Sequence, residues 1–224
     1  DLIQKNTHKI ILKRAYSSDI EIIKSLGDLC IRVCKKNKIS TVIKHIPGHG
    51  PAQKDSHLNL PIIKKSFSNL NNSDFNCFKN MNSHFAMTAH VIYHHLDKKN
   101  PVTFSNKIIN QIIKKKINFK GILISDDISM KALKFDLLTN ALKSLKAGCN
   151  LALYCGGNFK ESKNLVDTNK ISIVWESTYP EAKAMHLHPK QMGGAILSLD
   201  YMDPPTTWKW AGDDWEKNIN LDIV

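Results

Sequence analysis

Apolar strand patterns and amphipathic helix patterns alternate through most of the chain. Continuous apolar runs predict four strands, at residues 41–46, 85–91, 121–125 and 149–155. Helical periodicity predicts five helices, which begin near residues 18, 74, 105, 136 and 160. Strands that are apolar throughout and alternate with helices are typical of a buried parallel sheet. The pattern therefore predicts an α/β fold.

Capping residues mark the ends of several of these helices. Ser17 or Ser18 is expected to cap a helix that runs to about Asn37. Ser105 is expected to cap the helix that begins near residue 105. Gly148 is expected to end the helix over residues 136–147, because glycine readily adopts the left-handed conformation that follows a helix. The first helix is expected to place six apolar residues along one side: Ile20, Ile23, Leu26, Cys30, Ile31 and Cys34.

Titratable side chains lie where the predicted strands end. Lys44 and His45 lie at the end of the first strand, His90 near the end of the second, and Asp126 and Asp127 directly after the third. The carboxyl ends of parallel strands meet at one face of a (β/α)₈ barrel, and at one edge of a doubly wound sheet. We therefore expect a functional site at this end of the sheet.

The segment from Lys44 to His57 is the densest group of titratable residues outside regular structure. Pro47 breaks the preceding strand because it removes a backbone donor, and the glycines on either side of His49 allow unusual backbone angles. Asp55 and His57 converge only if the backbone turns between them. A histidine held by a carboxylate is a general acid/base at neutral pH, although an isolated Asp-x-His pattern is more often solvated surface.

The formal net charge of +12 raises the possibility of a nucleic-acid partner. Residues 1–167 hold 27 Lys and Arg against 12 Asp and Glu, whereas residues 168–224 hold 5 against 8. The cations are nearly all lysines, spread over helix faces without interleaved aromatic rings, while nucleic-acid surfaces favour arginine and stacking rings. We therefore expect no nucleic-acid partner.

Cysteine usage and hydropathy indicate a reduced, soluble protein. The five cysteines are odd in number and lack metal-ligand spacing, which favours free cytosolic thiols over a disulfide framework. No run of about 18 apolar residues and no signal-peptide pattern is present. The expected location is the cytoplasm, with no membrane association and no metal or other cofactor.

The composition changes after Asp167. All four tryptophans and four of the eight prolines lie in residues 168–224, where the net charge also changes sign. Short strands are predicted at residues 171–176, 185–188 and 195–199. The sequence therefore predicts two parts, residues 1–167 and residues 168–224.

Three motifs in residues 1–167 resemble the bacterial β-N-acetylglucosaminidases of glycoside hydrolase family 3. They are Lys44-His45-Ile46-Pro47-Gly48-His49-Gly50 with Asp55-Ser56-His57, then Thr88-Ala89-His90-Val91, then Ser125-Asp126-Asp127-Ile128-Ser129-Met130. The resemblance implies that the four predicted strands are strands five to eight of a (β/α)₈ TIM-type barrel. This part would then be the C-terminal half of a barrel without its first four strands.

The resemblance also implies a retaining mechanism. Asp126 matches the nucleophile, which forms a covalent glycosyl-enzyme, and His57 matches the acid/base that Asp55 orients. Arg14, Lys44 and His45 match residues that contact the sugar, although Leu12 stands where the family usually has glycine. Without the resemblance, Asp126 would be an N-cap of the following helix. The roles of Asp127, either an acceptor behind the nucleophile or a cap of a turn, and of His90 stay open.

Residues 171–215 resemble the last strands of the vicinal-oxygen-chelate superfamily, which includes glyoxalases. The resemblance rests on the segment from Met185 to Asp200. His186 and His188 could be metal ligands, but Ser198 stands where the superfamily places a glutamate, and two histidines cannot fill a metal site. We therefore expect a short β-rich glyoxalase-like fragment without a metal.

Three functions compete for the whole chain. The first is a glycoside hydrolase that removes terminal β-linked N-acetylglucosamine from muropeptide-type saccharides in peptidoglycan recycling, impaired because half of the barrel is missing. The second is a non-catalytic truncated or fused product that serves in binding or assembly. The third is a metal-dependent glyoxalase or epimerase activity of the tail. An open half-barrel would also favour self-association.

Overall fold

The computed structural model describes residues 1–155, 167, 173–178, 182–187 and 197–202. The chain divides into two compact units, Asp1–Cys155 and Gly156–Val224, which are treated separately below. The expected boundary at residue 167 stays a prediction.

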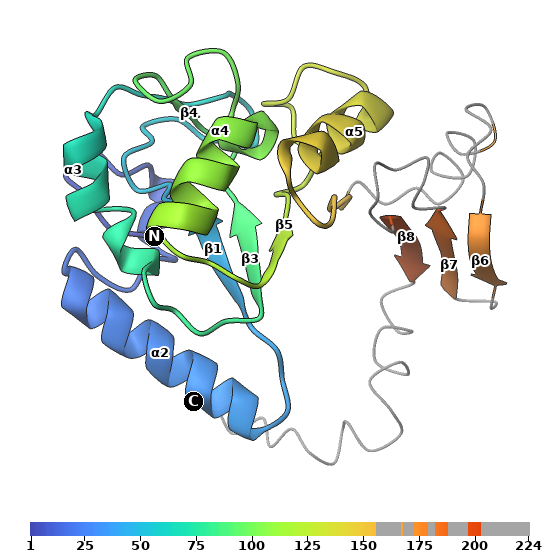
Figure 1. The fold of residues 1–224 in the computed structure, drawn as a ribbon, viewed down its shortest axis with the longest axis horizontal. Helices are drawn as coiled ribbons and strands as arrows, with labels where there is room; N and C mark the ends of the chain where they lie inside the picture. Colours follow the sequence, from blue (N-terminus) through green and yellow to red (C-terminus); the bar gives the residue numbers. More distant parts are fainter. Residues whose placement is uncertain (156–166, 168–172, 179–181, 188–196, 203–224) are drawn as a thin grey trace. The chain divides into compact units, whose positions relative to one another are not determined.

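A parallel three-stranded sheet forms the centre of the first unit (Figure 1). Its strands lie in the order β1 (Val42–Ile46), β3 (Phe85–Thr88) and β5 (Ile122–Ile124). Phe85 pairs with Val42 on one side and with Ile122 on the other. The predicted parallel sheet of an α/β fold is therefore confirmed.

The predicted fourth strand is wrong as a regular strand. Of residues 149–155, only Leu151 forms a β-bridge, parallel to Ile124 of β5. Further contacts continue alongside, since Ser125 N–H donates to Leu151 O at 2.9 Å and Ile128 N–H donates to Leu153 O at 2.8 Å. The segment thus runs beside β5, but the hydrogen bond from Leu153 N–H goes to the Ser125 hydroxyl and interrupts the ladder.

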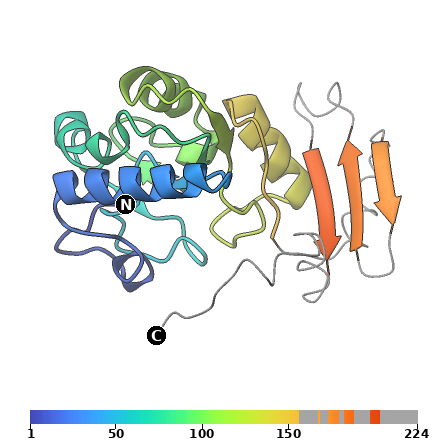
Figure 2. The ribbon, with the colours of Figure 1, turned by 90° about the horizontal axis from the view of Figure 1, so that it is seen from below.

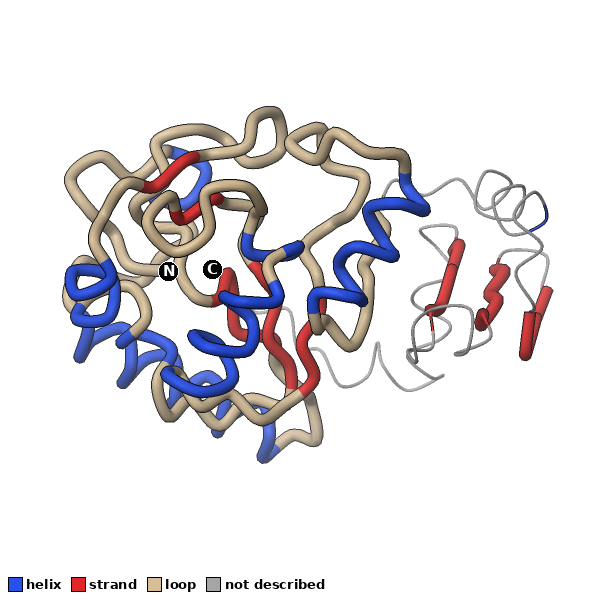
Figure 3. Tube along the Cα trace, turned by 45° about the horizontal axis from the view of Figure 1, so that its top comes forward, coloured by secondary structure: helices blue, strands red, loops and turns tan. Residues whose placement is uncertain are grey.

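Helices and short turns connect these strands (Figures 1 and 2). The α-helices are α1 (Lys9–Leu12), α2 (Ile20–Lys36), α3 (Phe67–Asn72), α4 (Asn106–Ile108) and α5 (Leu137–Ala147). The remaining turns are η1 (Asn76–Phe78), η2 (Val102–Phe104) and the π-helix η3 (Ile109–Lys116), which continues α4. Two-residue strands β2 (Ile62–Ile63) and β4 (Ile92–Tyr93) pair in parallel. Figure 3 shows that most of the remaining chain in this unit is loop.

Two helix predictions are wrong, one in its capping residue and one in the helix itself. The cap of α2 is Asp19, whose carboxylate accepts from Glu21 N–H and Ile22 N–H, rather than Ser17 or Ser18. The helix predicted over residues 74–81 is wrong, because Asp74 is fully buried and only η1 forms in that range. A buried carboxylate binds fixed donors, and this requirement overrides the local helix pattern.

Other helix ends were predicted correctly. Ser105 accepts from Ile108 N–H at the start of α4, and Gly148 ends α5 with a φ of 117°. The side of α4 and η3 that faces the sheet carries the predicted core residues, all at most 6 % exposed: Ile108, Ile109, Ile112 and Ile113.

Two cysteines belong to this core. Cys77 and Cys149 are 2 % and 5 % exposed, and both are free thiols. Burial raises the pKa of Cys77 to about 11 and that of Cys149 to about 12, because a thiolate is poorly solvated there. Neither thiol is therefore a nucleophile in the folded unit.

One edge of β1 pairs with no described strand, since β3 lies on its other side. A cavity of about 330 Å³ lies next to this edge, lined by β1, by α2 and by residues such as Asp1 and Arg14.

α2 also exposes an apolar stripe at helical spacing. It consists of Ile22, Leu26, Leu29 and Val33, each between 39 % and 52 % exposed. Leu26 and Cys30 were expected on the same side of the helix as Ile23 and Ile31, but they lie exposed, and the buried residues of α2 are Ile23 and Ile31.

The second unit holds an antiparallel sheet in the order β6 (Ile173–Thr178), β7 (Ala182–Leu187) and β8 (Leu197–Met202). Three strands were predicted in this region, with somewhat different ends. His186 of β7 pairs with Ser198 of β8 in the register of the sheet. His188 and the helix predicted near residue 160 lie outside the described residues.

Candidate active site

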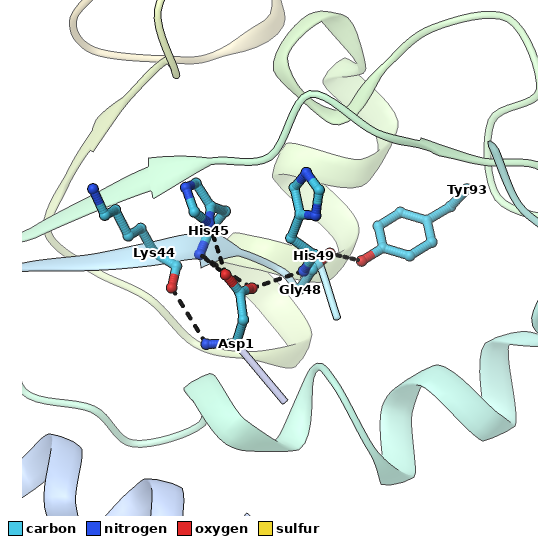
Figure 4. Close-up of polar contacts among 6 residues, drawn as sticks. All are labelled: Asp1, Lys44, His45, Gly48, His49 and Tyr93. Carbon is cyan, nitrogen blue, oxygen red and sulfur yellow. Dashed lines mark hydrogen bonds and ion pairs between the residues drawn. The ribbon is translucent and has the colours of Figure 1, made fainter. Parts of the chain in front are cut away.

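The carboxylate of Asp1 anchors the loop that leaves β1 (Figure 4). It accepts hydrogen bonds from His45 N–H at 3.2 Å, from His45 Nδ1 at 2.7 Å and from His49 N–H at 2.8 Å. The Asp1 side chain is only 5 % exposed, so these donors replace the water that a carboxylate would otherwise bind. Figure 4 shows the Lys44 ammonium and the His45 and His49 rings on the opposite side of the loop from Asp1.

Close backbone approach explains the glycines of this loop. A Cβ on Gly50 would lie 1.9 Å from the Leu2 carbonyl oxygen, which no real side chain could tolerate. Gly48 has a φ of 147°, which other residues rarely adopt, and the buried Tyr93 hydroxyl donates to its carbonyl. The glycines let the N-terminal segment and the buried Tyr93 hold the loop from two sides.

The charge of Asp126 acts on the pKa of three imidazoles, those of His45, His49 and His90. His45 lies close enough to Asp126, Lys44 and Arg14 for all three charges to act on its pKa. Burial lowers the pKa of His45 to about 4, which outweighs the opposing effect of the Asp126 carboxylate. Burial likewise lowers the pKa of His49 to about 3. Both rings are therefore neutral at pH 7, and Lys44 and Arg14 are side-chain cations whose charges act on His45.

His49 is buried without a hydrogen-bond partner. Its side chain is fully inaccessible, and neither ring nitrogen contacts a donor or acceptor among the described residues. The His49 ring lies 5.5 Å from the His45 ring, centroid to centroid. An unsatisfied buried imidazole has a stability cost, and such groups are more frequent at functional sites than elsewhere.

His57 and Asp55 form the predicted pair. The Asp55 carboxylate accepts from the His57 ring Nδ1 at 2.8 Å and from His57 N–H at 2.9 Å. Burial raises the pKa of Asp55, but the two hydrogen bonds from His57 outweigh it and hold the pKa below its usual value. The His57 side chain is 52 % exposed, so its other nitrogen is open to a ligand.

His90 is part of a buried hydrogen-bond network behind Asp126. Its Nε2 donates to the Asp127 carbonyl oxygen at 3.0 Å, so its Nδ1 must accept, at 2.7 Å, from the Thr103 hydroxyl. Thr103 in turn contacts the Thr88 hydroxyl at 2.9 Å, and Thr88 accepts from Asp126 N–H at 3.3 Å. The network fixes the backbone at Asp126 and occupies both nitrogens of His90, which gives His90 a structural role.

Replacing Thr103 with valine is expected to lower the free energy of unfolding by about 1–3 kcal/mol, because the shape is kept while two buried groups lose their partner. Urea unfolding measures the change. Thr139→Val is the matched control, since it removes a hydroxyl from an exposed contact with Asp136 and should cost about 0.5 kcal/mol. Equal losses for the two variants would contradict a buried network.

The structure thus gathers some predicted site residues and leaves others apart. Arg14, Lys44 and Asp126 all lie close enough to His45 for their charges to act on its pKa, whereas no hydrogen bond or ion pair within the described residues joins His57 to Asp126. The cavity beside β1 is lined by Arg14 and Lys44 but by neither Asp126 nor His57. The catalytic and sugar-binding roles remain predictions.

Two further results concern Asp126 and Asp127. Asp126 does not cap a helix, because its carboxylate accepts from Asp127 N–H at 2.9 Å and the next helix, α5, starts only at Leu137. Asp127 accepts from the Ser129 hydroxyl and from Cys155 N–H, and so ties its turn to the segment beside β5.

Sequence reasoning missed Asp1. It lies 44 residues before His45, so no local spacing connects the two. The only signal was its position just before the segment that carries Arg14.

The described residues contain no group of three or more His, Cys, Asp or Glu side chains arranged to hold a metal ion. They also contain no helix that is long and apolar enough to cross a membrane.

Comparison with known proteins adds a family to this geometry. The sequence model of the glycosyl hydrolase family 3 N-terminal domain matches residues 1–184. The β-hexosaminidase of Methylobacillus flagellatus is 32% identical over 201 residues, which is 87% of this chain and 57% of that protein. The β-hexosaminidase of Idiomarina loihiensis is 32% identical over 206 residues, which is 90% of this chain and 60% of that protein. The chain therefore spans somewhat more than half the length of these relatives.

Solved structures agree in fold. A glycoside hydrolase family 3 β-N-acetylglucosaminidase from Paenibacillus sp. matches 77% of this chain and 35% of its own with a TM-score of 0.68 and 25% identity. NagZ from Neisseria gonorrhoeae, solved in complex with N-trifluoroacetyl-D-glucosamine, matches 75% of this chain and 49% of its own with a TM-score of 0.66 and 28% identity.

Proposed function

Because this chain belongs to glycosyl hydrolase family 3, we propose that it provides a retaining β-N-acetylglucosaminidase site on the C-terminal half of a (β/α)₈ barrel. The order β1, β3, β5 and the segment after Gly148 supports the half-barrel, since each lies parallel beside the one before it. The proposed substrate is a saccharide with a terminal β-linked N-acetylglucosamine.

The observation that carries this proposal is that Asp126, Lys44 and Arg14 all lie close enough to His45 for their charges to act on it, with His45 and Asp126 near the carboxyl ends of parallel strands. Lys44 and Arg14 are donor-only cations suited to sugar oxygens, and Asp126 is a partly exposed carboxylate held by its backbone contacts.

The proposed mechanism has two steps. Asp126 attacks the anomeric carbon while His57 protonates the leaving oxygen, which yields a covalent glycosyl-enzyme. His57 then removes a proton from water, and the water displaces Asp126. Asp55 orients the His57 ring through the 2.8 Å contact to Nδ1 and stabilises its charged form. A sugar lies between nucleophile and acid in this mechanism, so no direct contact between Asp126 and His57 is required.

Covalent labelling tests the proposal. Incubation with 4-nitrophenyl N-acetyl-β-D-glucosaminide is expected to release nitrophenol, and a slowly hydrolysed fluorinated N-acetylglucosaminyl analogue is expected to label one peptide that contains Asp126. Mass spectrometry after proteolysis locates the label. A label on another carboxylate, or neither release nor label, would refute the assignment.

We also propose that this 224-residue chain by itself hydrolyses the N-acetylglucosaminide only slowly. The unpaired edge of β1 and the exposed apolar stripe of α2 support this proposal, since a complete barrel covers both. The same surfaces support self-association. The β-hexosaminidase of Methylobacillus flagellatus, assayed in parallel, provides the reference rate, and an equal rate would contradict the proposal.

The proposed setting is peptidoglycan recycling in the cytoplasm, with muropeptide-type saccharides as substrates. The five free cysteines support a reducing compartment. For residues 168–224, a glyoxalase-like origin stays a proposal. It is supported by the antiparallel sheet β6–β8, in which His186 lies opposite Ser198.

A further inference from the structure

The contact between Asp1 and His45 determines which nitrogen of the His45 ring carries the proton. An ionised carboxylate can only accept hydrogen bonds, so the proton in the 2.7 Å contact with Asp1 lies on Nδ1. Among the described residues, no hydrogen bond is made by the other ring nitrogen, Nε2. In the neutral ring, Nε2 is then an acceptor that faces away from Asp1 (Figure 4).

The other hydrogen bonds of the Asp1 carboxylate determine the direction of its hydrogen bond with the His45 ring. It accepts from two backbone N–H groups, of His45 and His49, and these donors cannot reverse their polarity. Asp1 is therefore fixed as an acceptor, and the ring must adapt to it. The Lys44 ammonium, a donor, lies on the same side of the loop as the His45 ring.

We propose that Asp1 is a positioning residue that holds His45 in the Nδ1–H tautomer and thereby presents Nε2 as a hydrogen-bond acceptor for a substrate hydroxyl next to Asp126. The inference rests on the proposed function. A hydroxyl both donates and accepts, so it can donate to His45 Nε2 and accept from Lys44 Nζ. The pair selects a free hydroxyl over an ether oxygen, which could not donate to Nε2.

The tautomer can be read directly in the unmodified chain. Long-range ¹H–¹⁵N correlation spectra at pH 7 separate protonated from unprotonated ring nitrogens, and the spectrum of a His45→Gln chain identifies the His45 signals by their loss. We expect His45 to show a protonated Nδ1 and an unprotonated Nε2. A protonated Nε2 in the unmodified chain would overturn the proposal, without any need for an Asp1 variant.

The Asp1→Asn variant tests whether the Asp1 carboxylate determines the tautomer of His45. The amide oxygen is expected to accept from the backbone N–H of His49, which places the amide NH₂ against His45 Nδ1. Because the NH₂ group donates, the ring should switch to the Nε2–H tautomer. The matched control is Asp97→Asn, since the Asp97 carboxylate also accepts from two backbone N–H groups, of Lys99 and Asn100, and from side chains, those of Asn100 and Ser105. His45 should keep its tautomer in that control, and an unchanged tautomer in Asp1→Asn would overturn the proposal.

Kinetics add a second result. Asp1→Asn is expected to raise KM for the nitrophenyl glycoside roughly tenfold, with kcat changed less than about threefold, because an acceptor in the substrate site becomes a donor. Asp97→Asn should change neither. Failure of the proposed function would appear as absent turnover in all chains, whereas failure of this inference appears in spectra recorded without substrate. The two failures are therefore distinguishable.

Discussion

Replacing Asp126 with asparagine is expected to lower nitrophenol release by roughly a thousandfold or more and to abolish labelling by the fluorinated analogue. The amide has nearly the shape of the carboxylate, and its oxygen can still accept from Asp127 N–H at 2.9 Å, so the turn should survive. It cannot form the covalent intermediate, however, and losses of this order are typical when a nucleophile is removed. Long incubations at high protein concentration allow a slow rate to be measured.

Asp136→Asn provides the control for this experiment. Asp136 caps α5 through Thr139 N–H, away from the strand ends, and its replacement should cost at most about 1 kcal/mol of stability while leaving turnover unchanged. If Asp126→Asn retained more than about a tenth of the original rate, Asp126 would not be the nucleophile.

Acid is expected to destabilise the first unit well above the range where carboxylates titrate. Burial lowers the pKa of His45 to about 4 and that of His49 to about 3, and it also lowers the pKa of His90, from an ordinary value of 6.5. Between these values the unfolded chain binds more protons than the folded chain, so stability falls as pH falls below 6.5. His45 and His49 should each contribute a slope of about 1.4 kcal/mol per pH unit, and His90 acts in the same direction. Burial raises the pKa of Asp74 above 3.8, which opposes the trend in part of this range.

Urea unfolding between pH 7.5 and 5 measures this slope. A His49→Gln chain is the informative comparison, because it removes one buried group that cannot protonate in the folded state. Its slope should be smaller by about one proton, even if its stability at pH 7.5 is altered. A stability that does not change between pH 6.5 and 5 would show that these rings protonate in the folded chain.

Sequence periodicity predicted the fold best where burial is continuous and local. The isoleucines of residues 108–113 repeat with the helix period directly after their cap Ser105, and Gly148 directly follows α5. The helix over α4 and η3 and the end of α5 were therefore predicted correctly. The helix expected from Asp74 failed because the Asp74 carboxylate accepts from Gln4 Nε2 at 2.8 Å, a contact across 70 residues. Local pattern contains no information about such a partner.

The site residues likewise divide into those that local sequence identified and those held by contacts distant in sequence. Strand ends and the family motif identified Lys44, His45, Asp126 and the Asp55–His57 pair, whose contact spans only two residues. Asp1 could not be found in this way, because its three hydrogen bonds reach residues 44 and 48 positions away. Its role follows from the path of the N-terminal segment against the loop, which depends on the absence of a side chain at Gly50.

The reactivity of the two buried thiols would report transient opening of the core of the first unit. Cys77 and Cys149 are almost inaccessible and have raised pKa values, while Cys30 and Cys155 are exposed. An alkylating reagent therefore meets two classes of sulfur on one polypeptide, one modified at once and one only when the core transiently separates. Quantitative mass spectrometry of the slow class would give the rate and frequency of that separation without any dye, tag or added probe residue.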